Sequence, residues 1–185
     1  MNPAPLEERS LYTYREYARL PEGAPYQLIG GKLVMTPSPS PYHQRVSKRL
    51  EFFLYDFVEK QHHLGEIFDA PIDVYFEETE VYQPDIIFIS QERQNIIGEQ
   101  KIEGAPDLII EVLSPSTAYY DLKHKMRVYA RHGVKEYWIV DPLERGIEVF
   151  ENKNGEFFLF SQATNRGEVV SKLLTGFRVM VEDIF

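Results

Sequence analysis

The stretch from residue 107 to residue 141 constrains the fold more than any other part of the sequence. It contains an apolar strand pattern, DLIIEVL at 107–113, then a helix pattern over about 119–132, then a second apolar strand pattern, KEYWIVD at 135–141. A strand, a helix and a strand in so few residues predict a right-handed crossover with the two strands parallel. The first strand is apolar on both faces apart from its acids, which is typical of the centre of a sheet.

The segments around this unit predict antiparallel strands and a second helix. YQLI and KLVM flank a Gly-Gly pair at 30–31, and IEVFEN and EFFLFS flank an Asn-Gly pair at 154–155, so each predicts a tight hairpin. The runs at 72–76 and 82–89 indicate further strands. The proline-rich TPSPSP cannot form a helix or a central strand, and it leads to a helix that Ser40 caps and that reaches about residue 62. We therefore expect an α/β fold with a mixed central sheet flanked by helices.

The domain organisation is expected to be simple. The 185 residues contain no repeat or flexible linker, which favours one domain over 1–185, with residues 1–25 as an N-terminal helical extension. The N-terminus has no apolar core of a signal peptide, and no apolar run approaches the ~20 residues that cross a bilayer. Cysteine is absent, so disulfides and thiolate zinc sites are excluded. We expect a cytoplasmic protein without a membrane partner.

The charge balance bears on function. The formal net charge is −9, from 29 acidic and 20 basic residues. Proteins that bind nucleic acid non-specifically usually have more basic than acidic residues, because contacts to phosphates supply most of their affinity. The balance therefore counts against a simple DNA-binding module. It does not exclude a nuclease, whose carboxylates add negative charge that bound metal ions offset.

Two acids lie in apolar strand patterns, Asp85 in QPDIIFI and Glu111 in DLIIEVL. A carboxylate in such a position costs several kcal/mol unless it is paired, hydrogen-bonded or bound to a metal. On neighbouring strands, the two could share a hard cation such as Mg²⁺ or Mn²⁺. The alternative is that each acid caps a loop, pairs with an arginine or faces solvent. This alternative is weaker for Glu111, which has apolar residues on both sides.

Other candidates each have two interpretations. Lys125 could stabilise a phosphate over the strand end, or form a surface pair with Asp121 one helical turn earlier, worth about 0.2–0.5 kcal/mol. Asp107 could serve the site or act as a turn acid that binds backbone amides. Ser114 could support the site, but a turn or a cap explains it best, and His43 either approaches the cleft or lies at the surface near its helix start.

Several segments resemble the Uma2 family in sequence and order. They are YQLIGGKLVMTPSPSPYHQRV, YQPDIIFIS, GAPDLIIEVLSPST, DLKHKMRVYARHGVKEYWIVDP and IEVF, which cover most of the chain from about residue 26 to residue 150. Uma2 belongs to the PD-(D/E)xK nuclease superfamily. The resemblance therefore implies a restriction-endonuclease-like fold, whose core is a mixed sheet flanked by helices.

The resemblance also implies site roles. In the superfamily, an Asp on one strand and Glu-x-Lys on the next bind Mg²⁺ and activate water; Asp85 and Glu111 match the two acids. Leu113 stands at the lysine position, and Lys125 on the following helix is the residue that fits the lysine role. The carbonyl of Val112 would be a third ligand. We expect a Mg²⁺-dependent endonuclease that acts on DNA. The rivals are a nuclease fold without cleavage that serves in binding, and a metal-dependent phosphodiesterase for RNA or nucleotides.

The aromatic content favours a homodimer. Twelve tyrosines and twelve phenylalanines exceed what one small core easily buries. Pairing of two copies about a two-fold axis is the commonest way to bury the aromatic side chains that remain exposed.

Overall fold

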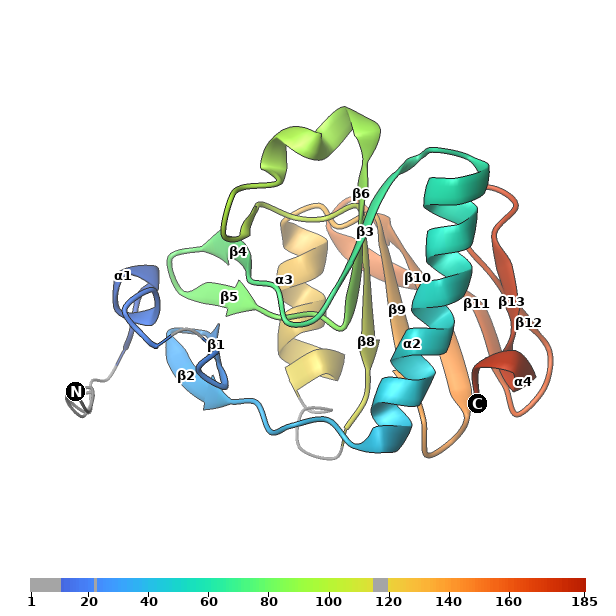
Figure 1. Ribbon diagram of the computed structural model, residues 1–185, viewed down its shortest axis with the longest axis horizontal. Helices are drawn as coiled ribbons and strands as arrows, with labels where there is room; N and C mark the ends of the chain where they lie inside the picture. The colour runs from blue at the N-terminus through green and yellow to red at the C-terminus, as the bar shows by residue number, and fades with distance from the viewer. Residues whose placement is uncertain (1–10, 22, 115–119) are drawn as a thin grey trace.

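A six-stranded sheet runs through the middle of the protein (Figure 1). The computed structural model describes residues 11–21, 23–114 and 120–185, the last range without the side chains of residues 120–122. In this sheet β8 and β9 are parallel, and the other neighbouring strands are antiparallel. The predicted mixed sheet and the parallel crossover pair are confirmed. In spatial order the strands are β11 (Glu156–Thr164), β10 (Gly146–Lys153), β9 (Glu136–Asp141), β8 (Leu108–Val112), β6 (Ile86–Ser90) and β3 (Gly65–Asp69).

A second, five-stranded sheet packs beside the first. The prediction of one strand over 82–89 is wrong, because β5 ends at Tyr82 in the second sheet while β6 begins at Ile86 in the first. Pro84 between them lacks the N–H that a continuous ladder needs. The spatial order is β2 (Lys32–Met35), β1 (Tyr26–Ile29), β5 (Glu80–Tyr82), β4 (Val74–Glu77) and β7 (Ile102–Glu103), and β12 (Glu168–Val170) pairs separately with β13 (Arg178–Met180).

Helices cover both faces of the six-stranded sheet (Figure 1). On one face lies α2 (Pro41–Tyr55), which continues into a π-helical turn, η1 (Asp56–Gln61). Ser40 caps α2 as predicted, since its Oγ accepts a hydrogen bond from the backbone N–H of His43 at 3.1 Å. On the other face lie η3 (Tyr120–Lys125) and α3 (Met126–Arg131). The remaining helices are α1 (Tyr14–Tyr17), η2 (Gln91–Ile96) and α4 (Val181–Ile184).

The two hairpin predictions are confirmed. The turn between β1 and β2 has positive φ at Gly30 (57°) and Gly31 (72°), which defines the primed geometry that matches strand twist. Asn154 and Gly155 likewise have φ of 56° and 87° between β10 and β11. Within the expected N-terminal extension, the described residues include α1. The expected first residue of the crossover helix, 119, lies outside the described residues.

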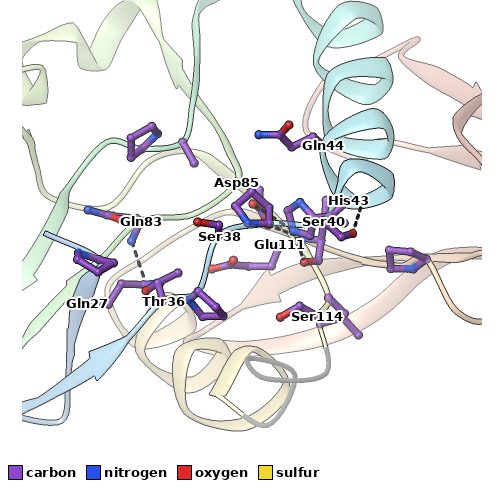
Figure 2. A pocket seen from close by; sticks show the side chains of 18 of the residues that line it. Gln27, Thr36, Ser38, Ser40, His43, Gln44, Gln83, Asp85, Glu111 and Ser114 are labelled. Carbon is purple, nitrogen blue, oxygen red and sulfur yellow. Dashed lines mark hydrogen bonds and ion pairs between the residues drawn. The ribbon is translucent and has the colours of Figure 1, made fainter. Parts of the chain in front are cut away.

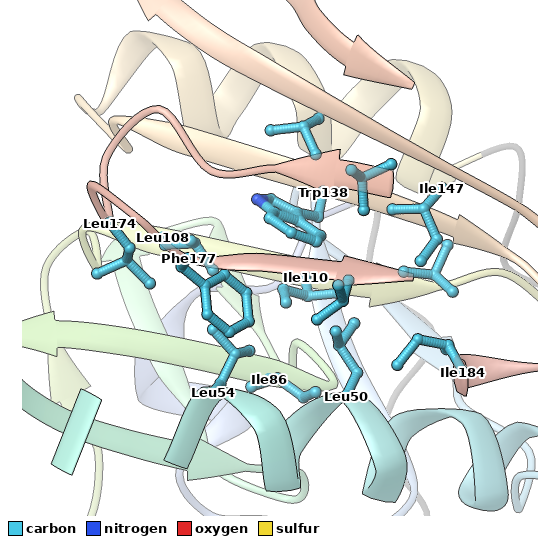
Figure 3. Close-up of a cluster of buried hydrophobic side chains, with 14 of the residues drawn as sticks. Leu50, Leu54, Ile86, Leu108, Ile110, Trp138, Ile147, Leu174, Phe177 and Ile184 are labelled. Carbon is cyan, nitrogen blue, oxygen red and sulfur yellow. The ribbon is translucent and has the colours of Figure 1, made fainter. Parts of the chain in front are cut away.

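The alternation of β8 divides the core into two layers. Leu108 and Ile110 face α2 in the cluster that also holds Leu50 and Trp138 (Figure 3). Ile109 belongs to the cluster on the α3 face. Because side chains alternate along a strand, Glu111 is directed to the same face as Ile109, toward α3. None of the helices in the described ranges is long and apolar enough to cross a membrane.

Candidate active site

A cavity of about 630 Å³ lies where β8 ends, next to the start of α2 and to η3. Figure 2 shows Asp85, His43 and Glu111 grouped in this cavity, with Ser114 nearby. Six of the residues singled out from the sequence line it: His43, Asp85, Glu111, Val112, Ser114 and Lys125. The fold thus brings together residues that lie far apart in the sequence.

Glu111 is almost completely buried, and donors on η3 and α3 hold its carboxylate. Its Oε1 accepts a hydrogen bond from Tyr129 Oη at 2.6 Å and forms an ion pair with Lys125 Nζ at 3.0 Å. The side chains of Lys125 and Glu111 are only 2% and 4% exposed. Lys125 Nζ also lies 5.6 Å from the centre of the Tyr82 ring, within the range of a cation–π contact. Lys125 is therefore part of a buried polar network, and interpreting it as a surface residue is wrong.

Asp121, the expected partner of Lys125, lies in the same helical segment. The backbone of Asp121 belongs to η3, but its side chain lies outside the described residues. Tyr129 has a polar role that sequence reasoning did not assign. Its position four residues after Lys125 is the available signal, because residues at that spacing share a helix face.

Asp85 lies directly before β6, rather than inside it. Its Oδ2 accepts a hydrogen bond from the backbone N–H of Val112 at 2.7 Å. In the antiparallel register of β6 and β8, Ile86 pairs with Ile110, and the next position along places Asp85 opposite Glu111. Asp85 is thus one residue outside the strand in which it was predicted, whereas the expectation that the two acids open into one cleft agrees with this register and with the shared cavity.

His43 reaches the cavity from the first turn of α2. Its Nε2 donates a hydrogen bond to the Val112 carbonyl at 2.9 Å and lies 3.5 Å from Asp85 Oδ1. Burial alone would lower the pKa of His43. The hydrogen bond and the negative charge that Asp85 provides raise it by more, so the pKa lies above its usual value. Its Nδ1 is buried and has no hydrogen-bond partner among the described residues. The side chain is thus directed to the cleft, as one of its two interpretations expected.

Asp107 lies at the opposite end of β8 and does not line the cavity. Its Oδ2 accepts a hydrogen bond from the N–H of Ser90, and its Oδ1 pairs with Lys135 at 2.7 Å and Arg93 at 3.2 Å. Burial raises the pKa of Asp107, but these donors outweigh it and leave the pKa below its ordinary value. The expectation of a supporting site role is not met, and the alternative of an acid that binds a nearby backbone amide describes the residue.

The donor set fits a hard divalent cation. The Asp85 and Glu111 carboxylates and the Val112 carbonyl are oxygen donors, which Mg²⁺ and Mn²⁺ prefer. Across the described ranges there is no cluster of three or more His, Cys, Asp or Glu side chains suited to a metal. Mg²⁺ does not require one, because it usually binds through one or two carboxylates and keeps several waters.

The described chain is a mixed sheet covered by helices, with Asp85 and Glu111 near the ends of adjacent strands and Lys125 on the helical segment beside them. A crystal structure titled "a putative nuclease belonging to DUF820", from Anabaena variabilis, has this fold: the TM-score is 0.77, with 23% identity over 94% of this chain and 97% of the other. The family model of Uma2, described as "Putative restriction endonuclease", matches residues 14–182. The chain belongs to the Uma2 family.

A relative in a cyanobacterium is similar along most of its length. It is "Uncharacterized protein sll1609" from Synechocystis sp., 26% identical over 157 residues that cover 82% of this chain and 87% of that protein. The match thus extends beyond the residues around the cavity.

Proposed function

We propose that the protein is a Mg²⁺- or Mn²⁺-dependent endonuclease that hydrolyses phosphodiester bonds of DNA. The observation that carries this proposal is the shared cavity, which is lined by Asp85, by Glu111 and by Lys125, the buried ion-pair partner of Glu111. Membership of Uma2 supports the class of activity. Asp85, Glu111 and the Val112 carbonyl would hold the ion. When bound, the ion would act as a Lewis acid and lower the pKa of a water.

The residues of the chain have distinct tasks in this proposal. Lys125 provides a fixed positive charge for the phosphate. Because the side chain is buried, little water screens its electrostatic attraction to the phosphate. Tyr129 holds the Glu111 carboxylate through a 2.6 Å hydrogen bond and so fixes the direction of its oxygens. The Val112 N–H does the same for Asp85.

A nuclease fold that binds without cleaving is the second candidate. Leu113 occupies the position of the lysine in the strand motif, and the net charge is −9. Both observations favour a binding or interaction module that has lost cleavage, although the negative charge counts against DNA as the partner of such a module. A phosphodiesterase for RNA or nucleotides is the third.

The direct test is a cleavage assay of the purified protein on DNA with Mg²⁺ or Mn²⁺. We expect cleavage that depends on the ion. The variant Asp85→Asn should need more metal for the same rate, because a neutral amide replaces an anionic ligand. No cleavage of any DNA with either ion would favour the binding protein, and cleavage of RNA alone would favour the third candidate.

The homodimer and the cytoplasmic location stay predictions. The outer strand β11 exposes the apolar side chains of Phe158, Leu159 and Phe160, which a second copy would have to cover in a homodimer.

A further inference from the structure

The walls of the cavity carry little positive charge. Among the described residues that line it, Lys125 is the lysine and there is no arginine, while Asp85 and Glu111 contribute two acids. Lys125 is also already paired with Glu111 at 3.0 Å. Binding of a DNA duplex depends on many lysine and arginine contacts to phosphates. The cavity does not provide the basic surface that a duplex needs.

The same walls are rich in apolar groups. Pro37 and Pro39 belong to the segment before α2, Tyr42 to its first turn, and Pro142 and Leu143 to the turn after β9. Leu143 is 80% exposed, more than any other large apolar residue of the described ranges. Proteins that take a base out of the stack hold it between aromatic and apolar side chains of this kind.

The size of the cavity suits one nucleotide. Its volume of about 630 Å³ falls within the range of roughly 300–1,000 Å³ that is typical of small-molecule sites. In a duplex, each base is stacked and paired, and its extrusion costs a few kcal/mol. An unpaired nucleotide can enter without this cost.

We propose that the cavity receives one nucleotide of a single-stranded DNA, with its base against Tyr42 and Leu143 and its phosphate toward Lys125, and that single strands are preferred over duplex. This inference rests on the proposed function, because it places the phosphate at the proposed metal site. Beyond that function, single-stranded DNA is the substrate form, and Tyr42 and Leu143 are the residues that select it.

The test is a binding measurement on the full chain by fluorescence anisotropy. The probes are a short labelled single strand and the duplex of the same sequence. Ca²⁺ replaces Mg²⁺ as an oxygen-binding cation. The single strand should bind at least about tenfold more tightly than the duplex, because the duplex must first unstack a base. Raising salt from about 50 mM to about 200 mM should weaken single-strand binding by less than about tenfold, since few phosphates are contacted.

Two variants test the placement of the base. Leu143→Ala should weaken single-strand binding by about tenfold, because its side chain loses the apolar contact. Phe52→Ala is the matched control: Phe52 is also exposed and apolar, but it does not line the cavity, so binding should not change. Equal or tighter binding of the duplex, unchanged binding by Leu143→Ala, or no binding of either DNA would overturn the inference.

The outcomes also separate this inference from the proposed function. If single strands bind as expected but are not cleaved when Mg²⁺ or Mn²⁺ replaces Ca²⁺, the proposed function fails and the binding mode stands. If the protein cleaves DNA but prefers duplex, the inference fails and the proposed function stands.

Discussion

Replacing Lys125 with alanine should lower the rate of DNA cleavage by about 10²–10³-fold, the usual loss when one preorganised charge stabiliser is removed. The reason is its position: the side chain is 2% exposed and lines the cavity that holds both acids. The rate should be measured at saturating Mn²⁺, so that a change in metal affinity does not contribute. Lys123→Ala is the matched control, because Lys123 lies in the same turn, is exposed and does not line the cavity.

The same substitution should also reduce stability. A surface pair with Asp121 would predict a loss of about 0.5 kcal/mol or less. The observed pair is buried, and loss of the ammonium leaves the Glu111 carboxylate without its counter-charge, so we expect a loss of about 3 kcal/mol in the free energy of unfolding. Addition of Mn²⁺ should restore part of the lost stability in Lys125→Ala, because the bound cation would offset the charge of Glu111. Lys125→Met, which keeps the aliphatic stem, serves if the alanine variant does not fold.

Two results would contradict this role of Lys125. Full cleavage activity in Lys125→Ala would end its assignment to the phosphate. A stability loss that Mn²⁺ leaves unchanged would mean that the Lys125–Glu111 pair is structural and separate from any metal site.

Glu136→Ala should destabilise the protein by about 3–5 kcal/mol, because several buried donors would lose their acceptor together. Glu136 is 1% exposed, and its carboxylate accepts hydrogen bonds from Trp138 Nε1 and Ser171 Oγ, each at 2.7 Å. It also accepts from the backbone N–H groups of Lys172 at 2.7 Å and Leu173 at 2.8 Å. One side chain of β9 thus ties the segment before β13 to the six-stranded sheet.

Urea unfolding followed by Trp138 fluorescence measures this effect. Glu136→Gln should be less damaging than Glu136→Ala, since the amide oxygen can still accept from some of the donors. Glu156→Ala, at an exposed position of β11, is the control and should stay within about 0.5 kcal/mol of the unmodified protein. A loss below about 1 kcal/mol in Glu136→Ala would show that other acceptors replace the carboxylate.

The parts of the fold that local chemistry determines were predictable. The hairpin turns depend on residues that tolerate positive φ, and Gly30, Gly31, Asn154 and Gly155 supply them. The parallel pairing of β8 with β9 was predictable because a helix connects the two strands, and a strand–helix–strand unit forms a crossover between parallel strands. The break between β5 and β6 was missed, because the apolar pattern continues past Pro84 although the two halves pair with different sheets.

The two acids of the candidate site were predictable, whereas their contacts with side chains of the helix were not. Asp85 and Glu111 attract notice because charged groups in apolar strands need partners, and both line the cavity. The hydrogen bond from Tyr129 to Glu111 joins a helix to a strand, and no local pattern reports such a contact. The i,i+4 rule gave Lys125 a helical partner worth a few tenths of a kcal/mol, whereas its contact with Glu111 is decided by tertiary packing.

Titration of Mn²⁺ into the purified protein, followed by calorimetry, tests most directly whether Asp85 and Glu111 form a divalent metal site. We predict that the unmodified protein binds Mn²⁺, and that Asp85→Asn binds it more weakly. Asp183→Asn, at an exposed position away from the cavity, should bind as the unmodified protein does. If the unmodified protein binds no Mn²⁺, or if Asp85→Asn binds it equally tightly, the carboxylates do not hold a metal and the proposed mechanism is wrong.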